Sequence, residues 1–124
     1  MKSSKITFIT ADEHYVVTKA VAFFLNEIYK YADVYQAHTI KGVLDILRTT
    51  KVDLLILDIF SPQGEVINVI KTLKKIQPKL KILVFSGSRK KDFKEYVLNA
   101  GADFFLSKSC SESEIKQTII NLIH

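Results

Sequence analysis

Residues 54–58 read LLILD, a run of four apolar side chains that ends in an acid. A second run of this kind, ILVFS, occupies residues 82–86. A strand with one face in water alternates apolar and polar residues, but these two runs do not alternate, so both of their faces must be covered. We therefore expect two central strands of a parallel sheet with helices on each side, which is an open α/β sandwich.

Three further short apolar runs extend this pattern in both directions. The five predicted strands are residues 6–10, 34–37, 54–57, 82–85 and 104–106. Between them apolar residues recur at intervals of three and four, and each such stripe predicts a helix with one buried face. Gly101 is placed as a left-handed helix cap, and Ser111 with Glu114 has capping-box spacing. The alternation predicts five β-α units in a single domain, residues 1–124.

The composition is that of a folded, soluble protein. The chain has 124 residues, 48% of them hydrophobic, and 18 Lys+Arg against 13 Asp+Glu give a formal charge of +5. This apolar content argues against disorder, and the longest apolar run, residues 20–25, is too short to span a membrane. A single cysteine, Cys110, excludes an internal disulfide and a thiolate zinc site, which favours a cytoplasmic location.

Polar side chains stand where the predicted strands end. Asp12 and Glu13 follow the first strand, Asp58 the third and Ser86 the fourth, and Lys108 follows closely after the fifth. Singly, an Asp or Ser there is usually a turn or helix cap, and a Lys is usually solvated. The carboxyl ends of parallel strands share the sheet edge where α/β proteins bind ligands, so we expect these side chains to lie together.

This set of side chains has a specific chemistry. Three neighbouring carboxylates repel one another, and one would take up a proton unless a cation compensates. Mg²⁺ prefers oxygen ligands in octahedral geometry, so these donors suit it better than they suit zinc. Lys108 and Ser86 would then hold the oxygens of a phosphoryl group, and Asp58 would be the attacking carboxylate. The residues thus predict magnesium-dependent phosphoryl chemistry on an aspartate.

At these positions the sequence resembles the receiver domains of two-component response regulators, over residues 5–123. The resemblance rests on ADEH at 11–14, on DIFSP at 58–62, on FSG at 85–87 and on AGADFFLSK at 100–108. It implies a flavodoxin-like (βα)5 three-layer sandwich with a parallel five-stranded sheet in the order 2-1-3-4-5. Ser109 stands where many members have proline, and here the sequence is most similar to receivers of regulators that carry a LuxR-type helix-turn-helix.

The resemblance implies a phosphoacceptor and a set of metal ligands. Asp58 would receive a phosphoryl group from a sensor histidine kinase or a histidine phosphotransfer protein. Glu13 and Asp58 would bind Mg²⁺ directly, the backbone carbonyl of Phe60 would be a third ligand, and Asp12 would act mainly through water. The domain would take part in its own phosphotransfer and dephosphorylation rather than act as an enzyme on a separate substrate.

The resemblance also implies a switch. The Ser86 hydroxyl would move to bond the phosphoryl group, Phe105 would turn inward behind it, and Lys108 would pair with the phosphoryl oxygens. Phosphorylation would then shift the population of a surface formed by the fourth helix, the fifth strand and the fifth helix. A DNA-binding domain outside this chain would receive the signal, and dimerisation through the same surface is an expectation from the family.

Four further positions depart from the family pattern. Glu13 stands where many members have Asp, and Val66 stands four residues after the proline, where Gly is usual. Phe105 lacks the hydroxyl of the commoner Tyr, so its inward turn gains no hydrogen bond. Phe60 is bulky, and we hypothesise that it slows the access of water to phosphorylated Asp58. A phosphoryl half-life that no substitution of Phe60 changes would count against this hypothesis.

Three other functions compete with this one. A haloacid dehalogenase needs a second Asp two residues after Asp58, where Phe60 stands. A nucleotide or flavin binder would need a glycine-rich phosphate loop, which the four glycines do not form. A receiver-like docking module that works without phosphorylation stays open, because Glu13 and Val66 depart from the pattern.

Basic residues are concentrated between Val66 and Lys94, a stretch whose only acid is Asp92. One group precedes the fourth strand and another follows it, so the strand holds the two groups roughly 17 Å apart at opposite ends of the sheet. Neither group is interleaved with aromatic residues as in proteins that bind single-stranded nucleic acids. We therefore interpret these residues as solvated charge, and predict no direct nucleic-acid or membrane binding by this domain. His14, beside the acids, is likewise taken as solvated.

Overall fold

The computed structural model describes residues 5–59, 63–88 and 91–124. Strands and helices alternate along the chain, as the sequence predicts. They are β1 (Thr7–Asp12), α1 (Tyr15–Ile28), β2 (Asp33–Ala37), α2 (Ile40–Thr49), β3 (Leu54–Asp58), α3 (Gln63–Ile76), β4 (Lys81–Ser86), α4 (Lys91–Ala100), β5 (Phe104–Ser107) and α5 (Glu112–Ile123). The predicted strand boundaries agree with these to within two residues.

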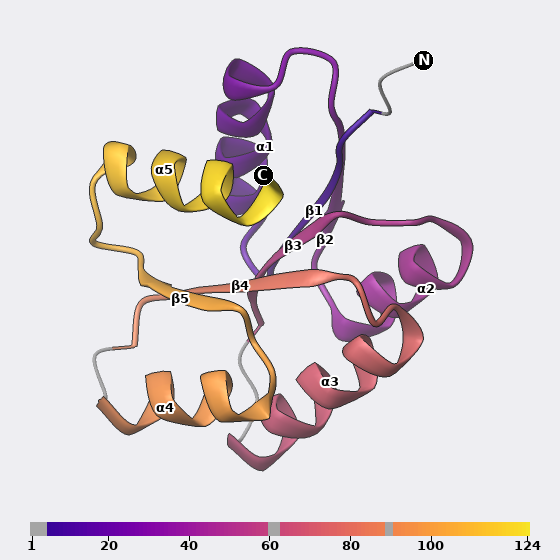
Figure 1. Ribbon diagram of the computed structural model, residues 1–124, viewed down its shortest axis with the longest axis vertical. Helices are drawn as coiled ribbons and strands as arrows, with labels where there is room; N and C mark the ends of the chain where they lie inside the picture. Colours follow the sequence, from indigo (N-terminus) through magenta and orange to yellow (C-terminus); the bar gives the residue numbers. More distant parts are fainter. Residues whose placement is uncertain (1–4, 60–62, 89–90) are drawn as a thin grey trace.

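The strands form one parallel sheet in the order β2-β1-β3-β4-β5. Helices α1 and α5 cover one face, and α2, α3 and α4 cover the other (Figure 1). This is the flavodoxin-like three-layer sandwich that was expected. None of the helices in the described part of the chain is long and apolar enough to cross a membrane.

The core explains why the central strand does not alternate in polarity. Leu55 and Leu57 of β3 belong to the cluster under α2, α3 and α4, whereas Leu54 and Ile56 belong to the cluster under α1 and α5. All four side chains are at most 3% exposed. Each such burial contributes about 1.5–3 kcal/mol to stability, so both faces of β3 hold the layers together.

The strand register brings the carboxyl ends of the strands together at one edge. Asp12 at the end of β1 pairs with Asp58 at the end of β3. Ser86 at the end of β4 pairs with Ser107 at the end of β5, and Lys108 follows directly. The predicted helix ends are also confirmed, since Gly101 has a φ of 120° and Ser111 with Glu114 forms a capping box.

Candidate functional site

A buried ion-pair cluster lies at the carboxyl edge of the sheet. Asp12 is 2% exposed and Asp58 7% exposed. The Lys108 ammonium donates to Asp12 Oδ2 at 2.7 Å and also forms an ion pair with Asp58 Oδ2. The backbone N–H of Lys108 donates to the carbonyl of Ser86 at 2.8 Å, which anchors the lysine to the end of β4. Two buried carboxylates thus share one cation.

The charges of this cluster are incompletely balanced. Burial raises the pKa of Asp58 to about 6, against the opposing pull of Lys108. Burial also acts to raise the pKa of Asp12, but hydrogen bonds from Lys108 and His14 outweigh it and leave that pKa below its usual value. Burial acts to lower the pKa of Lys108, and its bonds to both carboxylates raise it above the usual value. The cluster carries an excess negative charge that a hard cation would compensate.

The turn after β1 presents the remaining acid. The backbone N–H of His14 donates to Asp12 Oδ1 at 2.8 Å, and His14 Nδ1 lies 3.0 Å from the same oxygen. The His14 ring is largely exposed, as expected, but it contacts the site. Glu13 is exposed and has no hydrogen bond or ion pair to the rest of the described chain. In the described residues no three acidic, His or Cys side chains are grouped closely enough to hold a metal ion.

The predicted switch residues occupy the ends of β4 and β5. Ser86 is fully buried, and its hydroxyl oxygen accepts a hydrogen bond from the backbone N–H of Ser88 at 3.0 Å. Phe105 is half-buried, and its ring meets that of Phe93 in α4 edge to face, with centroids 6.0 Å apart. Phe105 therefore connects β5 to α4 through an aromatic contact in the core.

Two positions singled out in the sequence concern the loop after β3. Phe60 lies outside the described residues. Its carbonyl is an expected metal ligand, and its side chain is expected to slow dephosphorylation. Val66 is 7% exposed and packs in the core cluster with Ile70 of α3. The valine that replaces the usual glycine thus contributes to the core.

Sequence reasoning missed a contact that supports the turn carrying the acids. His38, just after β2, stacks on Tyr15, the first residue of α1, with ring centroids 3.7 Å apart and an angle of 9°. The buried Thr18 hydroxyl donates to the Tyr15 carbonyl at 3.1 Å, so it accepts from His38 Nε2 at 3.0 Å. Only the pairing of β1 with β2 brings these residues together, and nothing in the local sequence signals it.

Comparison with known proteins agrees with this fold. The sequence model of the response regulator receiver domain matches residues 8–120. The chain therefore belongs to the family of response regulator receiver domains.

Individual relatives share only low sequence identity with this chain. The chain is similar to the Fimbriae Z protein of Escherichia coli K12, with 28% identity over 107 residues that make up 86% of this chain and 51% of that protein. It thus spans about half the length of the curated relatives that it matches.

Solved structures share the fold at low identity. A LuxR family DNA-binding response regulator from Silicibacter pomeroyi superimposes with a TM-score of 0.82 at 23% identity, covering 95% of this chain and 91% of that one. A response regulator protein from Burkholderia pseudomallei, with a phosphorylated aspartic acid, calcium ion and citrate, gives 0.78 at 23% identity, covering 90% of this chain and 65% of that one.

Proposed function

We propose that this domain is a phosphorylation-switched receiver in which Asp58 accepts a phosphoryl group from a phosphohistidine of a sensor histidine kinase or histidine phosphotransfer protein. The single observation that carries the proposal is the buried Asp58 at the end of β3, held beside Asp12 by Lys108. Asp58 shares its cation with Asp12, and burial raises its pKa to about 6; a buried carboxylate with a perturbed pKa beside a lysine is a candidate nucleophile for an anionic substrate.

The transfer uses the groups at this sheet edge. One Asp58 oxygen forms the new P–O bond while the P–N bond of the phosphohistidine breaks, and the imidazole leaves. Lys108 turns from Asp12 and Asp58 to donate to the phosphoryl oxygens. Asp12 and Asp58 would hold Mg²⁺ together with Glu13 once its exposed side chain turns toward them, and the ion would supply positive charge for the oxygens of the transferred group. Asp58 must be ionised to attack; burial, which raises its pKa to about 6, disfavours that form, and a bound Mg²⁺ would favour it.

The signal would leave the site through β4 and β5. A phosphoryl group on Asp58 would be a stronger hydrogen-bond acceptor for the Ser86 hydroxyl than the groups around that hydroxyl in the unphosphorylated domain. Displacement of Ser86 would alter the neighbouring ends of β4 and β5, and the contact between Phe105 and Phe93 would pass the change to α4. Phosphorylation thus biases two arrangements of the α4/β5/α5 surface, through which a homodimer or an effector domain would respond.

The phosphodonor protein would dock beside Lys108. An apolar groove between α1 and the start of α5 includes Val17, Phe24, Lys108 and Ile115. The neighbouring Val16 is 79% exposed. A protein seated there would bring its phosphohistidine to the carboxyl edge of the sheet. By analogy with the LuxR family DNA-binding response regulator that shares this fold, the output would be a DNA-binding domain that regulates transcription. The domain would act in the cytoplasm, as expected from its single cysteine.

The test is intact-protein mass spectrometry after incubation with acetyl phosphate, with and without Mg²⁺. We expect a magnesium-dependent gain of one phosphoryl group in the wild type and no gain in Asp58→Asn. The exposed, isolated Glu13 favours one alternative, a docking module that works without phosphorylation. The absence of any gain in protein shown to be folded would favour that alternative.

A further inference from the structure

The edge of the sheet opposite the phosphoacceptor gathers lysines from separate parts of the sequence. Because the strands are parallel, the segments that precede β1, β3 and β4 all meet at this amino edge. They place Lys5, Lys51, Lys79 and Lys81 around one groove with a volume of about 590 Å³. We call it the basic groove. All four lysines are exposed, and apolar residues such as Val52 and Leu80 form part of its lining.

The carboxylates at this edge are already engaged. Asp33 lies 3.8 Å from Lys5, Asp53 accepts the backbone N–H of Thr7 at 2.8 Å, and Asp103 pairs with Lys74 at 2.7 Å. In the part of the chain that the structure describes, Lys51, Lys79 and Lys81 have no acidic partner. Asp53 also lines the groove, but four lysines outnumber it, so the basic groove holds an excess of positive charge beside apolar surface.

The helix ends at this edge do not use these lysines. The side-chain amide of Gln77 donates to the carbonyls of Leu47 and Thr50, at 2.9 and 2.6 Å, and accepts from the backbone of Val52 at 3.0 Å. The end of α2 is thus satisfied by an uncharged side chain. Capping of the α2 carbonyls does not explain why the lysines converge.

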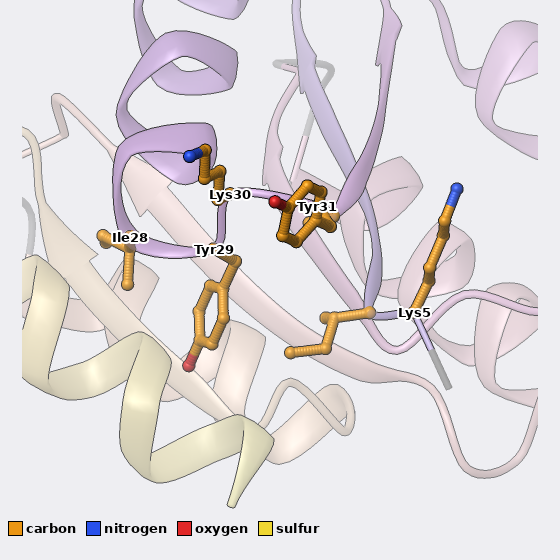
Figure 2. Close-up of a pocket in the computed structure, with 7 residues that line it drawn as sticks. Lys5, Ile28, Tyr29, Lys30 and Tyr31 are labelled. Carbon is orange, nitrogen blue, oxygen red and sulfur yellow. The ribbon is translucent and has the colours of Figure 1, made fainter. Parts of the chain in front are cut away.

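An exposed aromatic ring adjoins the basic groove. Tyr31, in the turn after α1, is 75% exposed, and the Lys30 ammonium lies 5.8 Å from the centre of its ring. Figure 2 shows Tyr31 between Lys30 and Lys5. Lys5 and Ile6 line both this second hollow and the basic groove, so the two hollows adjoin at these residues. In the sequence no aromatic residue is interleaved with these lysines. In the fold the turn between α1 and β2 brings one, Tyr31, beside them.

We propose that the amino edge of the sheet binds single-stranded nucleic acid, with the phosphate backbone along the basic groove and a base stacked on Tyr31. Lysines act as flexible point charges for phosphates, and an exposed aromatic ring offers stacking without base selectivity. An acidic peptide would match the charge but would not use the ring. This inference does not rest on the proposed receiver chemistry, and it replaces the interpretation of these lysines as solvated charge.

Fluorescence anisotropy with a labelled oligothymidine of about 16 nucleotides tests the proposal. If the four groove lysines contact phosphates, the slope of log affinity against log salt concentration is about −3. The triple variant Lys51→Gln, Lys79→Gln and Lys81→Gln should weaken binding by about tenfold or more and flatten the slope. The control variant Lys19→Gln, Lys94→Gln and Lys116→Gln, which changes net charge equally on exposed lysines outside the groove, should weaken it by less than about threefold.

The ring is tested separately. Tyr31→Ser should weaken binding by about tenfold, whereas Tyr96→Ser, which removes a 44% exposed tyrosine from α4, should not. Circular dichroism would confirm that each variant is folded. The absence of binding by the wild type, or equal losses in the two lysine triples, overturns the proposal. A polyglutamate peptide that binds the groove when the oligonucleotide does not would also overturn it, because the partner would then be an acidic protein segment.

Discussion

At the scale of single residues, the cluster around Asp58 depends on one lysine serving two acids. Lys108 compensates both Asp12 and Asp58 in the resting domain. A divalent cation at the same oxygens would compete with the ammonium, because two positive charges repel strongly in a site with little water. In the proposed reaction the lysine would therefore oppose metal binding before transfer and would assist the phosphoryl group during transfer.

Replacement of this lysine should separate the two effects. In Lys108→Met we expect Mg²⁺ to bind about tenfold more tightly, because its competitor is gone. Phosphorylation by acetyl phosphate should slow about 100-fold, because a donor to the phosphoryl oxygens is lost. Isothermal titration calorimetry and time-resolved mass spectrometry measure the two quantities. Lys116→Met, on the exposed side of α5, is the control and should change neither. Weaker Mg²⁺ binding in Lys108→Met would contradict the competition.

The raised pKa of Asp58 predicts a cost to stability. The shift from 3.8 to about 6 means that the folded protein holds this proton more tightly than the unfolded chain does. The contribution of Asp58 to stability therefore falls as pH rises through that window and stays unfavourable above it. The shift corresponds to roughly 3 kcal/mol, which is an upper limit because Asp12 and Lys108 titrate together with it.

Asp58→Asn removes that cost, because an amide does not ionise. We expect this variant to be more stable than the wild type at pH 7, by about 1–3 kcal/mol. The difference should shrink below about pH 4, where Asp58 is protonated in both the folded and the unfolded wild type. Urea unfolding of both proteins at the two pH values measures it. A difference that is independent of pH would show that ionisation of Asp58 is not its cause.

At the scale of helices and strands, the end of α4 depends on backbone conformation. Gly101 has a φ of 120°, and a Cβ built there would meet no atom closer than Ile70 Cγ2 at 3.8 Å. The cost of a side chain at this position is thus backbone strain, and steric overlap contributes nothing.

Gly101→Ala should therefore lower stability by about 1–2 kcal/mol, seen as a fall of roughly 5 °C or more in Tm. Gly87→Ala serves as the control, because a Cβ there meets nothing within 4 Å and its φ is not positive. We expect that variant to unfold within about 0.5 kcal/mol of the wild type. Calorimetry of the three proteins gives the comparison, and equal Tm values for wild type and Gly101→Ala would refute the argument from strain.

Elements could be predicted where local chemistry decides them. The apolar runs of β3 and β4 are buried on both faces, and the capping box before α5 forms from residues three apart. The end of β1 was placed two residues too early, because Ala11 and Asp12 are held in the sheet by pairing with Leu57 and Asp58. That pairing is a property of the neighbouring strand and leaves no mark in the sequence of β1 itself.

At the scale of the whole molecule, the parallel topology of the sheet decides which residues lie close together. It brings Asp12, Asp58, Ser86 and Lys108 to one edge, which the order of strand ends in the sequence could predict. It could not predict that Glu13 faces solvent, since that depends on how the turn after β1 is held. The stack of Tyr15 on His38 and the convergence of lysines at the opposite edge also depend on strand order, so they became visible only in three dimensions.

The two-sided burial of β3 has a consequence for how insertions and deletions would be tolerated. Its four apolar residues could pack against either helical layer, because leucine and isoleucine side chains fill the core on both faces. A one-residue shift of the strand would exchange the layers that these side chains face while leaving them apolar throughout. The same shift would move Asp58 by about 3.3 Å along the sheet, out of step with Asp12. The length of this strand is thus constrained by the alignment of Asp58 with Asp12 as well as by folding.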